Sequence, residues 1–292
     1  MRATASTFDY YTPKTVAEVL SLIGKLKPVK MIAGGTDFVP AVRLKGFRPK
    51  HVVSLVNLRK KLSYVTFNGG TVRIGALTRI TDAQRSEHIR KKAPCLDEAL
   101  SQIGSVQIRN MATIGGNLCN ASPAADSAPP LLVLDASVEI IRKGGRRTIP
   151  LKDFFLGPGK TALRRSELLR EIAFRPEAGT ASSFQKLGRT RGEDISTATA
   201  AVLIKTDGSR ISRARIALGS VAPTPIRAYK SEKELVGKTI SEAVLDSAAV
   251  KAAEEAKPIT DVRASRDYRR SAVEALVRQG LDQALERAHG GA

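Results

Sequence analysis

The chain has 292 residues, of which 42% are apolar and 4% aromatic, and its 48 Lys and Arg against 28 Asp and Glu give a net charge of +20. This length predicts about two domains with a sizeable buried core. Two cysteines, Cys95 and Cys119, and three scattered histidines exclude a disulfide framework and a zinc or iron–sulfur site built by this chain alone. Redox chemistry here would therefore need an organic cofactor.

The positive charge invites a nucleic-acid-binding interpretation. Aromatic residues that could stack on bases are scarce, tryptophan is absent, and the basic residues are spread from Arg2 to Arg287. We favour a basic surface that is complementary to acidic partner subunits, and we keep nucleic-acid binding as the alternative. No apolar run approaches the roughly 18 residues of a membrane helix, and residues 1–6 lack the apolar core of a secretory signal. The low cysteine content then predicts a cytoplasmic location.

The first glycine-bearing segment follows a predicted helix and a predicted strand. Thr15-Val16-Ala17-Glu18 is a capping box that predicts a helix, which Pro28 ends. Residues 29–33 predict a short strand that runs directly into Gly34-Gly35-Thr36-Asp37. Glycine lets peptide N–H groups approach phosphate oxygens closely, so this segment is typical of a loop that binds a large anion. Taken alone it also fits a plain turn, and a Rossmann fold is rejected because no G-x-G-x-x-G follows.

Residues 51–104 alternate strand and helix. The sequence predicts a buried strand over 51–56 and a hairpin of 62–67 with 71–76 across Asn68-Gly69-Gly70. Helices are predicted from Asp82 to about His88 and from Pro94 to Ile103, with Gly104 as the C-cap of the second. This order indicates an α+β or mixed α/β region.

A second glycine-bearing segment, Gln107–Asn117, follows at once and continues to Asp126. As in the first segment, an apolar run is followed by a Gly-Gly pair and a small polar residue. We therefore predict a second loop. Side chains of Thr36, Asp37, Asn117 and Asp126 could then hydrogen-bond to sugar hydroxyls or ring edges. Two such loops favour a nucleotide-like ligand far more than one does.

The middle of the chain predicts one more hairpin and a further glycine-rich loop. Residues 131–134 form a short apolar segment, and 138–142 pairs with 147–151. Gly157–Thr161 resembles half a P-loop, but Phe154 stands where the P-loop glycine is required, so an NTPase is rejected. We expect an ordered loop near a partner or the cofactor.

The composition changes around residues 176–180, and the best domain boundary lies there. Strands are predicted over 183–188, 197–205 and 211–221, with Asp207-Gly208 turning the second into the third. Helices are predicted over 231–236, 241–255 and 267–287, the last with apolar residues at helical spacing. The predicted division is therefore 1–177, with subdomains of about 1–58 and 59–177, followed by 178–292 as a three-stranded antiparallel sheet backed by helices.

With both glycine segments placed, the chain resembles the FAD-binding medium subunits of the molybdenum hydroxylases, a family that includes carbon monoxide dehydrogenase, bacterial xanthine dehydrogenase and aldehyde or aromatic-acid oxidoreductases. The resemblance spans essentially the whole length. It rests on four ordered matches, which are Ala33–Asp37, Gln107–Leu118 continuing through Ala121–Asp126, Phe184–Arg189 running to Asp194-Ile195-Ser196, and Ala264–Arg270. It implies an α+β chain with a two-part FAD-binding domain of the PCMH-type, vanillyl-alcohol-oxidase-like architecture.

The resemblance also implies which residues bind FAD. They are Met31, Ile32, Ala33, Gly34, Gly35, Thr36, Asp37, Phe38, Ile103, Thr113, Ile114, Gly115, Gly116, Asn117, Asp126, Leu169 and Lys186. Residues 31–38 would wrap the pyrophosphate, and 113–117 would form a second wall around the diphosphate and ribityl chain. Asp126 would bind the adenosine end or ribose, and Ile103 would pack on the cofactor.

Leu169 and Lys186 are the last two implied contacts. The Lys186 cation would stabilise the negative charge of the reduced flavin ring, and an exposed strand lysine is the alternative. Some family members have histidine where Thr36 stands, so FAD is expected here without a covalent bond. One branch carries an extra cysteine-bearing insert for an iron–sulfur cluster, and this chain lacks those cysteines.

The resemblance implies that this chain is one of three different subunits of a complex. A large subunit with a molybdenum–pterin cofactor would oxidise the substrate, and a small subunit with two [2Fe–2S] clusters would carry electrons to the FAD of this chain. The FAD would pass them to an external acceptor, within a dimer of heterotrimers. We find no catalytic Ser/His/Asp group or carboxylate pair and expect no catalytic or metal-ligating residue here. The alternatives are a free-standing FAD oxidoreductase of the same fold and a basic nucleic-acid-binding protein.

Overall fold

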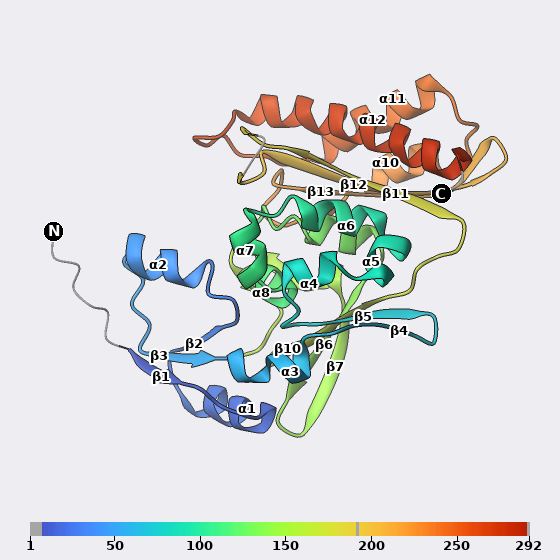
Figure 1. The fold of residues 1–292 in the computed structure, drawn as a ribbon. Coiled ribbons are helices and arrows are strands. Elements are labelled where there is room, and N and C mark those ends of the chain that lie inside the picture. Colours follow the sequence, from blue (N-terminus) through green and yellow to red (C-terminus); the bar gives the residue numbers. More distant parts are fainter. Residues whose placement is uncertain (1–7, 191–192, 291–292) are drawn as a thin grey trace.

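A computed structural model describes residues 8–190 and 193–290 (Figure 1). The chain begins with a small parallel sheet of β1 (Asp9–Tyr11), β3 (His51–Ser54) and β2 (Val29–Ile32), in the order β1-β3-β2. Helix α1 (Val16–Lys25) connects β1 to β2 and buries Val19 and Ile23. The Thr15 hydroxyl accepts a hydrogen bond from the Glu18 N–H at 3.2 Å, which confirms the predicted capping box.

Helix α2 (Phe38–Leu44) follows the first glycine segment directly, and none of its seven residues is buried. The chain then forms β3, a 3₁₀ turn η1 (Val56–Leu58) and the single-turn helix α3 (Arg59–Leu62). Because Leu62 belongs to α3, the predicted strand over 62–67 starts later than expected.

The second sheet has five antiparallel strands in the order β4-β5-β10-β6-β7. They are β4 (Val65–Asn68), β5 (Thr71–Gly75), β10 (Leu168–Phe174), β6 (Ser137–Arg142) and β7 (Gly145–Pro150). Both predicted hairpins are confirmed, with Asn68 opposite Thr71 and Arg142 opposite Gly145. The central strand β10 had not been predicted from the sequence.

Six short helices cover one face of this sheet (Figure 1). They are α4 (Ile80–Gln84), α5 (Glu87–Lys92), α6 (Pro94–Ser101), α7 (Val106–Met111), α8 (Ile114–Asn120) and α9 (Ala128–Val133). The prediction of one helix from Asp82 to His88 is wrong, because the chain there breaks into α4 and α5. The second glycine segment, predicted as a loop, is in fact α7 and α8. After β7 come a 3₁₀ turn η2 (Leu151–Asp153) and a small hairpin of β8 (Phe155–Gly157) and β9 (Lys160–Thr161).

The C-terminal part is built on a third sheet of four antiparallel strands, not three. The strands are β11 (Thr180–Leu187), β12 (Ala198–Asp207), β13 (Arg210–Gly219) and β14 (Ile226–Arg227), in that order. The fourth strand pairs only with Ala217 and Leu218. Two residues that follow Pro225 are too short a run to show strand periodicity, which explains why the sequence did not predict it.

The third sheet is buried on both faces. Helices α10 (Tyr229–Leu235), α11 (Glu242–Glu255) and α12 (Arg266–Gly290) lie on one side, and α6 and α9 lie on the other (Figure 1). Alternation along β12 sends Val202 and Ile204 into the core under α11 and α12, whereas Ala201 and Leu203 join the core of the N-terminal part. The division at residues 177 and 178 stays a prediction. Among the described helices, none has the length and hydropathy to cross a membrane.

Candidate functional site

The two glycine segments lie against each other. A Cβ atom on Gly34 would overlap the carbonyl oxygen of Met111 and would come within 2.9 Å of the Ala112 Cα. A Cβ on Gly116 would lie 3.8 Å from the Cβ of Ala33. The end of β2 is therefore seated directly on the junction between α7 and α8, and only glycine fits at position 34.

The first segment offers unused hydrogen-bond donors. Within the described residues, the backbone N–H groups of Gly34, Gly35 and Thr36 donate to no backbone acceptor, and no side-chain bond to the Thr36 hydroxyl is formed. Gly35 has a φ of +76°, a conformation that glycine adopts at little cost. Consecutive free N–H groups beside a small, partly exposed turn are the donor set that a diphosphate requires.

The second segment uses its N–H groups within the protein. Thr113 caps α8, because its hydroxyl accepts the Gly116 N–H at 3.0 Å. The N–H groups of Ile114 and Gly115 donate to the carbonyl groups of Thr78 and Ala76 at 3.0 and 2.9 Å. This segment is therefore a fixed wall rather than a second loop of free donors, which corrects the prediction. A Cβ on Gly115 would lie 2.5 Å from the Ala76 oxygen, so glycine is needed for this docking.

Asn117 is held at the end of that wall. Its Oδ1 accepts a hydrogen bond from the Ser127 hydroxyl at 2.6 Å, which orients the amide. Its Nδ2 donates to no acceptor among the residues that the structure describes, and the side chain is partly exposed. The amide therefore remains available as a donor to a ligand beside the first segment.

Asp126 and Lys186 form a buried ion pair. Lys186 Nζ lies 2.9 Å from Asp126 Oδ2, with side chains only 6% and 7% exposed. Lys186 also donates to the carbonyl groups of Gln102 at 2.8 Å and Asp194 at 3.2 Å, so its three hydrogens all have acceptors. The Ser196 hydroxyl donates to Asp126 Oδ1 at 2.5 Å. Burial raises the pKa of the Asp126 carboxyl, against the opposing effects of the Lys186 charge and the Ser196 hydrogen bond.

This contact corrects two expectations. Lys186 is not an exposed strand lysine, because its side chain is almost completely buried. Asp126 and Lys186 also cannot lie at the adenosine and flavin ends of one extended dinucleotide, since the two side chains touch. The cofactor contact of each stays a prediction.

Ile103 and Leu169 have different positions. Ile103 is 8% exposed and adjoins Gln102, and its carbonyl accepts a hydrogen bond from Arg109 at 3.1 Å. It therefore belongs to the same corner as Lys186. Leu169 is 3% exposed within β10, opposite Ile140, and lies among the core side chains of the five-stranded sheet. The structure does not bring its side chain to an open surface of the site, and its cofactor contact stays a prediction.

Several residues that shape this corner were not predicted. Met111 and Ala112 form the seat of Gly34, and the main chain of Gln102 and Asp194 fixes Lys186. Backbone contacts leave no signal in residue identity, so the sequence could not have revealed them. Ser196 was the exception, because it ends the Phe184–Ser196 match and carries a hydroxyl.

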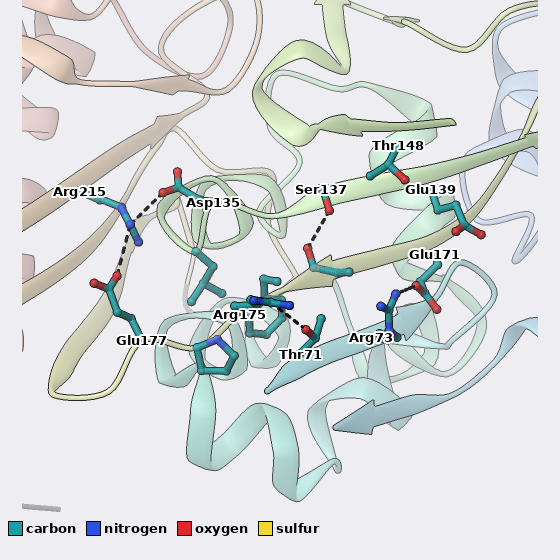
Figure 2. Close-up of a pocket in the computed structure, with 14 residues that line it drawn as sticks. Thr71, Arg73, Asp135, Ser137, Glu139, Thr148, Glu171, Arg175, Glu177 and Arg215 are labelled. Atoms are coloured by element: carbon teal, nitrogen blue, oxygen red, sulfur yellow. Dashed lines mark hydrogen bonds and ion pairs between the residues drawn. The ribbon is translucent and has the colours of Figure 1, made fainter. Parts of the chain in front are cut away.

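A large open hollow lies elsewhere. Figure 2 shows this cavity of about 650 Å³ on the outer, polar face of the five-stranded sheet, and it contains none of the predicted site residues. Its carboxylates pair with arginines, as in Arg73–Glu171 at 2.5 Å and Arg215–Asp135 at 2.9 Å. Charge pairing across a solvated sheet face explains this hollow. The free N–H groups of the first glycine segment lie outside it.

Comparisons with known proteins cover almost the whole chain. Residues 6–175 match the family described as the FAD binding domain in molybdopterin dehydrogenase, and residues 182–284 match the CO dehydrogenase flavoprotein C-terminal domain. The chain is 34% identical over 282 residues to the carbon monoxide dehydrogenase medium chain of Hydrogenophaga pseudoflava, covering 96% of this chain and 98% of that one. It is 31% identical over 284 residues to the xanthine dehydrogenase FAD-binding subunit of Escherichia coli O157:H7, covering 97% of each.

Solved structures give the same result. Carbon monoxide dehydrogenase from Hydrogenophaga pseudoflava, in a form that lacks the Mo-pyranopterin moiety, superposes with a TM-score of 0.92 at 34% identity. That match covers 96% of this chain and 98% of the other. Quinoline 2-oxidoreductase from Pseudomonas putida 86 superposes with a TM-score of 0.91 at 28% identity, covering 97% and 98%.

Proposed function

This chain belongs to the family of FAD-binding medium subunits of molybdopterin dehydrogenases, and from that membership we propose how electrons pass through it. It is a flavoprotein medium subunit of the carbon monoxide dehydrogenase and xanthine dehydrogenase type. Electrons from the molybdenum–pterin site of a large subunit pass to two [2Fe–2S] clusters of a small subunit. The FAD of this chain receives them from those clusters. An external acceptor takes the electrons from the flavin.

The free N–H groups of the first glycine segment carry this proposal. Gly34, Gly35 and Thr36 would donate to the FAD diphosphate, and the capped start of α8 would form the wall behind it, with the Asn117 amide as a further donor. Thr36 has no imidazole with which to attach a flavin, so the FAD is held without a covalent bond. The remaining residues of 31–38 and 113–117 shape the cradle around these donors.

The bound FAD supplies the conversion between one-electron and two-electron transfer, and the protein supplies position and electrostatics. The Asp126–Lys186 pair, tied to Ser196 and to Gln102 beside Ile103, fixes the corner where the two parts of the chain meet. Two cysteines cannot ligate even one cluster, since such clusters take four ligands. The clusters therefore belong to companion chains.

The assembly and location follow from the same membership. The relatives are named as medium chains or subunits, which supports a complex of several chains, and we place this chain in a dimer of heterotrimers. Its two thiols, Cys95 and Cys119, are free, which is compatible with the reducing cytoplasm.

Purification of the tagged chain from its native host tests this function. Flavin, iron and molybdenum are assayed together with the identity of co-purifying chains. The proposal predicts stoichiometric FAD with iron, molybdenum and two companion chains. FAD alone with turnover of a small substrate would instead establish a free-standing flavoenzyme, and a colourless protein rich in bound nucleic acid would contradict both.

A further inference from the structure

An exposed surface on and around α2 lies beside the cofactor site and, apart from Phe38, contains none of the predicted FAD-binding residues. We call it the α2 patch, and it comprises Phe8, Tyr10, Phe38, Val39, Arg43, Leu44, Lys45, Phe47, Arg48 and Lys50. Leu44 is 82% exposed and Val39 46%, and α2 buries no residue at all. Figure 1 shows α2 at the periphery, joined to the rest of the molecule through β2 and the segment that leads to β3. Contiguous apolar exposure of this kind marks an interaction surface.

The patch is held in shape by its own side chains. The ring of Phe38 packs edge-to-face on Phe8 and on Phe47, with centroids 6.0 and 6.2 Å apart. Arg48 Nη1 donates to the carbonyl groups of Val42 at 2.9 Å and Phe47 at 3.1 Å, which ties the segment after α2 back onto the helix. A preformed apolar surface loses little conformational entropy on binding.

The rim of the patch is predominantly basic, although the exposed carboxylates of Asp9 and Asp37 adjoin it. Residues 8–62 contain eleven Lys and Arg against three Asp and Glu, and no acidic residue occurs between Asp37 and Asp82. In the part of the chain that the structure describes, none of the four basic residues over 43–50 has a carboxylate within 4.0 Å. By contrast, the arginines in the Figure 2 hollow largely pair with acids of the same chain. The charge at α2 is therefore uncompensated.

The shape and charge of the α2 patch favour one kind of binding partner. A second copy of this chain would place the same cations against one another across a two-fold axis, which is unfavourable. The aromatic rings engage each other edge-on, which leaves them poorly arranged to stack on bases. We propose that the α2 patch docks another subunit of the same complex through an acidic surface with an apolar centre.

This docking rests on the proposed function and adds a location to it. Phe38, the first residue of α2, directly follows the glycine segment that would hold the diphosphate. The partner would therefore sit beside the cofactor site rather than on the far C-terminal helices. Charge complementarity at its rim would speed association and make it depend on salt.

The test compares charge-reversed variants of the complex. Lys45→Glu with Lys50→Glu removes rim charge without touching a side-chain hydrogen bond, and Leu44→Ser removes the apolar centre. The matched controls are Arg142→Glu with Lys143→Glu, at the exposed end of β6 and in the turn after it, and Ile259→Ser, whose side chain is 68% exposed away from the patch. Each tagged variant is purified with its companion chains, and the dissociation constant for those purified companions is measured at low and high salt.

We expect both patch variants to weaken association by about tenfold or more, and the double charge reversal to flatten its salt dependence. The controls should match the wild type, and FAD content and melting temperature should be unchanged in all variants. If the patch variants bind the companion chains as tightly as the wild type does, the docking proposal is overturned, although the proposed function still stands when FAD and companions are present. If the isolated chain dimerises and Leu44→Ser abolishes the dimer, the occupant is a second copy and the proposal is overturned. If the chain binds an oligonucleotide and the charge reversal abolishes that binding, the occupant is a nucleic acid and the proposal is likewise overturned. Wild-type protein without FAD or companions would instead overturn the proposed function itself.

Discussion

Lys186 and Asp126 meet as a buried ion pair, with Nζ 2.9 Å from Oδ2, although one residue lies in β11 and the other follows α8. The pair joins the four-stranded sheet to the segment that carries the second glycine motif. Because Lys186 also binds the carbonyl groups of Gln102 and Asp194, one ammonium group fixes three separate stretches of chain. The corner that adjoins the cofactor cradle thus depends on a contact between the two parts of the protein.

Lys186→Met should be strongly destabilising, because it leaves the Asp126 carboxyl buried without its cation. Breaking a buried pair from one side costs about 3–5 kcal/mol, which urea unfolding would detect. Lys233→Met on the exposed surface of α10 is the matched control and should change little. The double variant Asp126→Leu with Lys186→Met should recover much of the loss. A single variant as stable as the wild type would show that the pair does not hold this corner.

Asp261 gives a prediction for acid pH. Its carboxylate binds Arg263 and the buried Arg269, and the Arg263 guanidinium first, with Arg269 adding to it, holds the pKa of Asp261 well below its usual value. Since the folded state holds this proton more weakly than the unfolded chain, the stabilisation is present at neutral pH and is lost as the pH falls below about 4.

We expect Asp261→Asn to lower the free energy of unfolding by about 1.5–3 kcal/mol at pH 7. The difference from the wild type should stay constant down to pH 5 and shrink below pH 4, as measured by urea unfolding at each pH. A difference that grows on acidification would contradict this assignment.

Gly34→Ala tests the close approach of the two glycine segments. The added Cβ would overlap the Met111 carbonyl oxygen, so the chain must shift, and overpacking of this kind costs about 1–3 kcal/mol. Gly24→Ala in α1 is the control, because nothing lies within 4 Å of its added Cβ and alanine favours the helix by about 1 kcal/mol. Thermal unfolding should move in opposite directions for the two variants. Equal melting temperatures would indicate that the segments are not in contact.

The two free thiols should be nearly inert in the native protein. Burial raises the pKa of Cys95 and of Cys119 to about 12, so only roughly one thiol in ten thousand is ionised at pH 8. Iodoacetamide labelling followed by mass spectrometry should show slow reaction of both, with the slightly exposed Cys119 ahead of the fully buried Cys95. Labelling in urea should be complete within minutes, and fast native labelling of Cys95 would contradict its burial.

Much of the fold could be predicted from local sequence. The capping box at Thr15, the hairpin turns at Gly69-Gly70 and Gly144, and the long C-terminal helix each carry a signal that neighbouring residues complete. Strand β10 carries no such local signal, because its two partly exposed residues, Arg170 and Ala173, are three positions apart and a register shift after Leu169 breaks its alternation. Its position at the centre of the sheet depends on pairing with strands about 30 and 100 residues earlier.

The candidate site likewise combines features that local sequence predicts with features that depend on contacts between distant segments. Glycine at 34 and 115–116 pointed to close backbone approach, and the structure shows what is approached. The sequence could not predict that residues 114–120 are helical, because the carbonyl groups of Ala76 and Thr78 hold the start of α8 despite the poor helix propensity of glycine. Nor could it place Asp126 against Lys186, since that contact arises only when the four-stranded sheet packs on the N-terminal part.

Quantification of flavin released by acid denaturation tests the central claim most directly. Wild-type protein and Gly24→Ala should release stoichiometric FAD into the supernatant, whereas Gly34→Ala should retain little, because the segment that carries the free N–H groups is displaced. FAD that stays with the precipitated chain would show a covalent bond. Full FAD content in Gly34→Ala, or none in the wild type, would contradict the assignment of the diphosphate to this glycine segment.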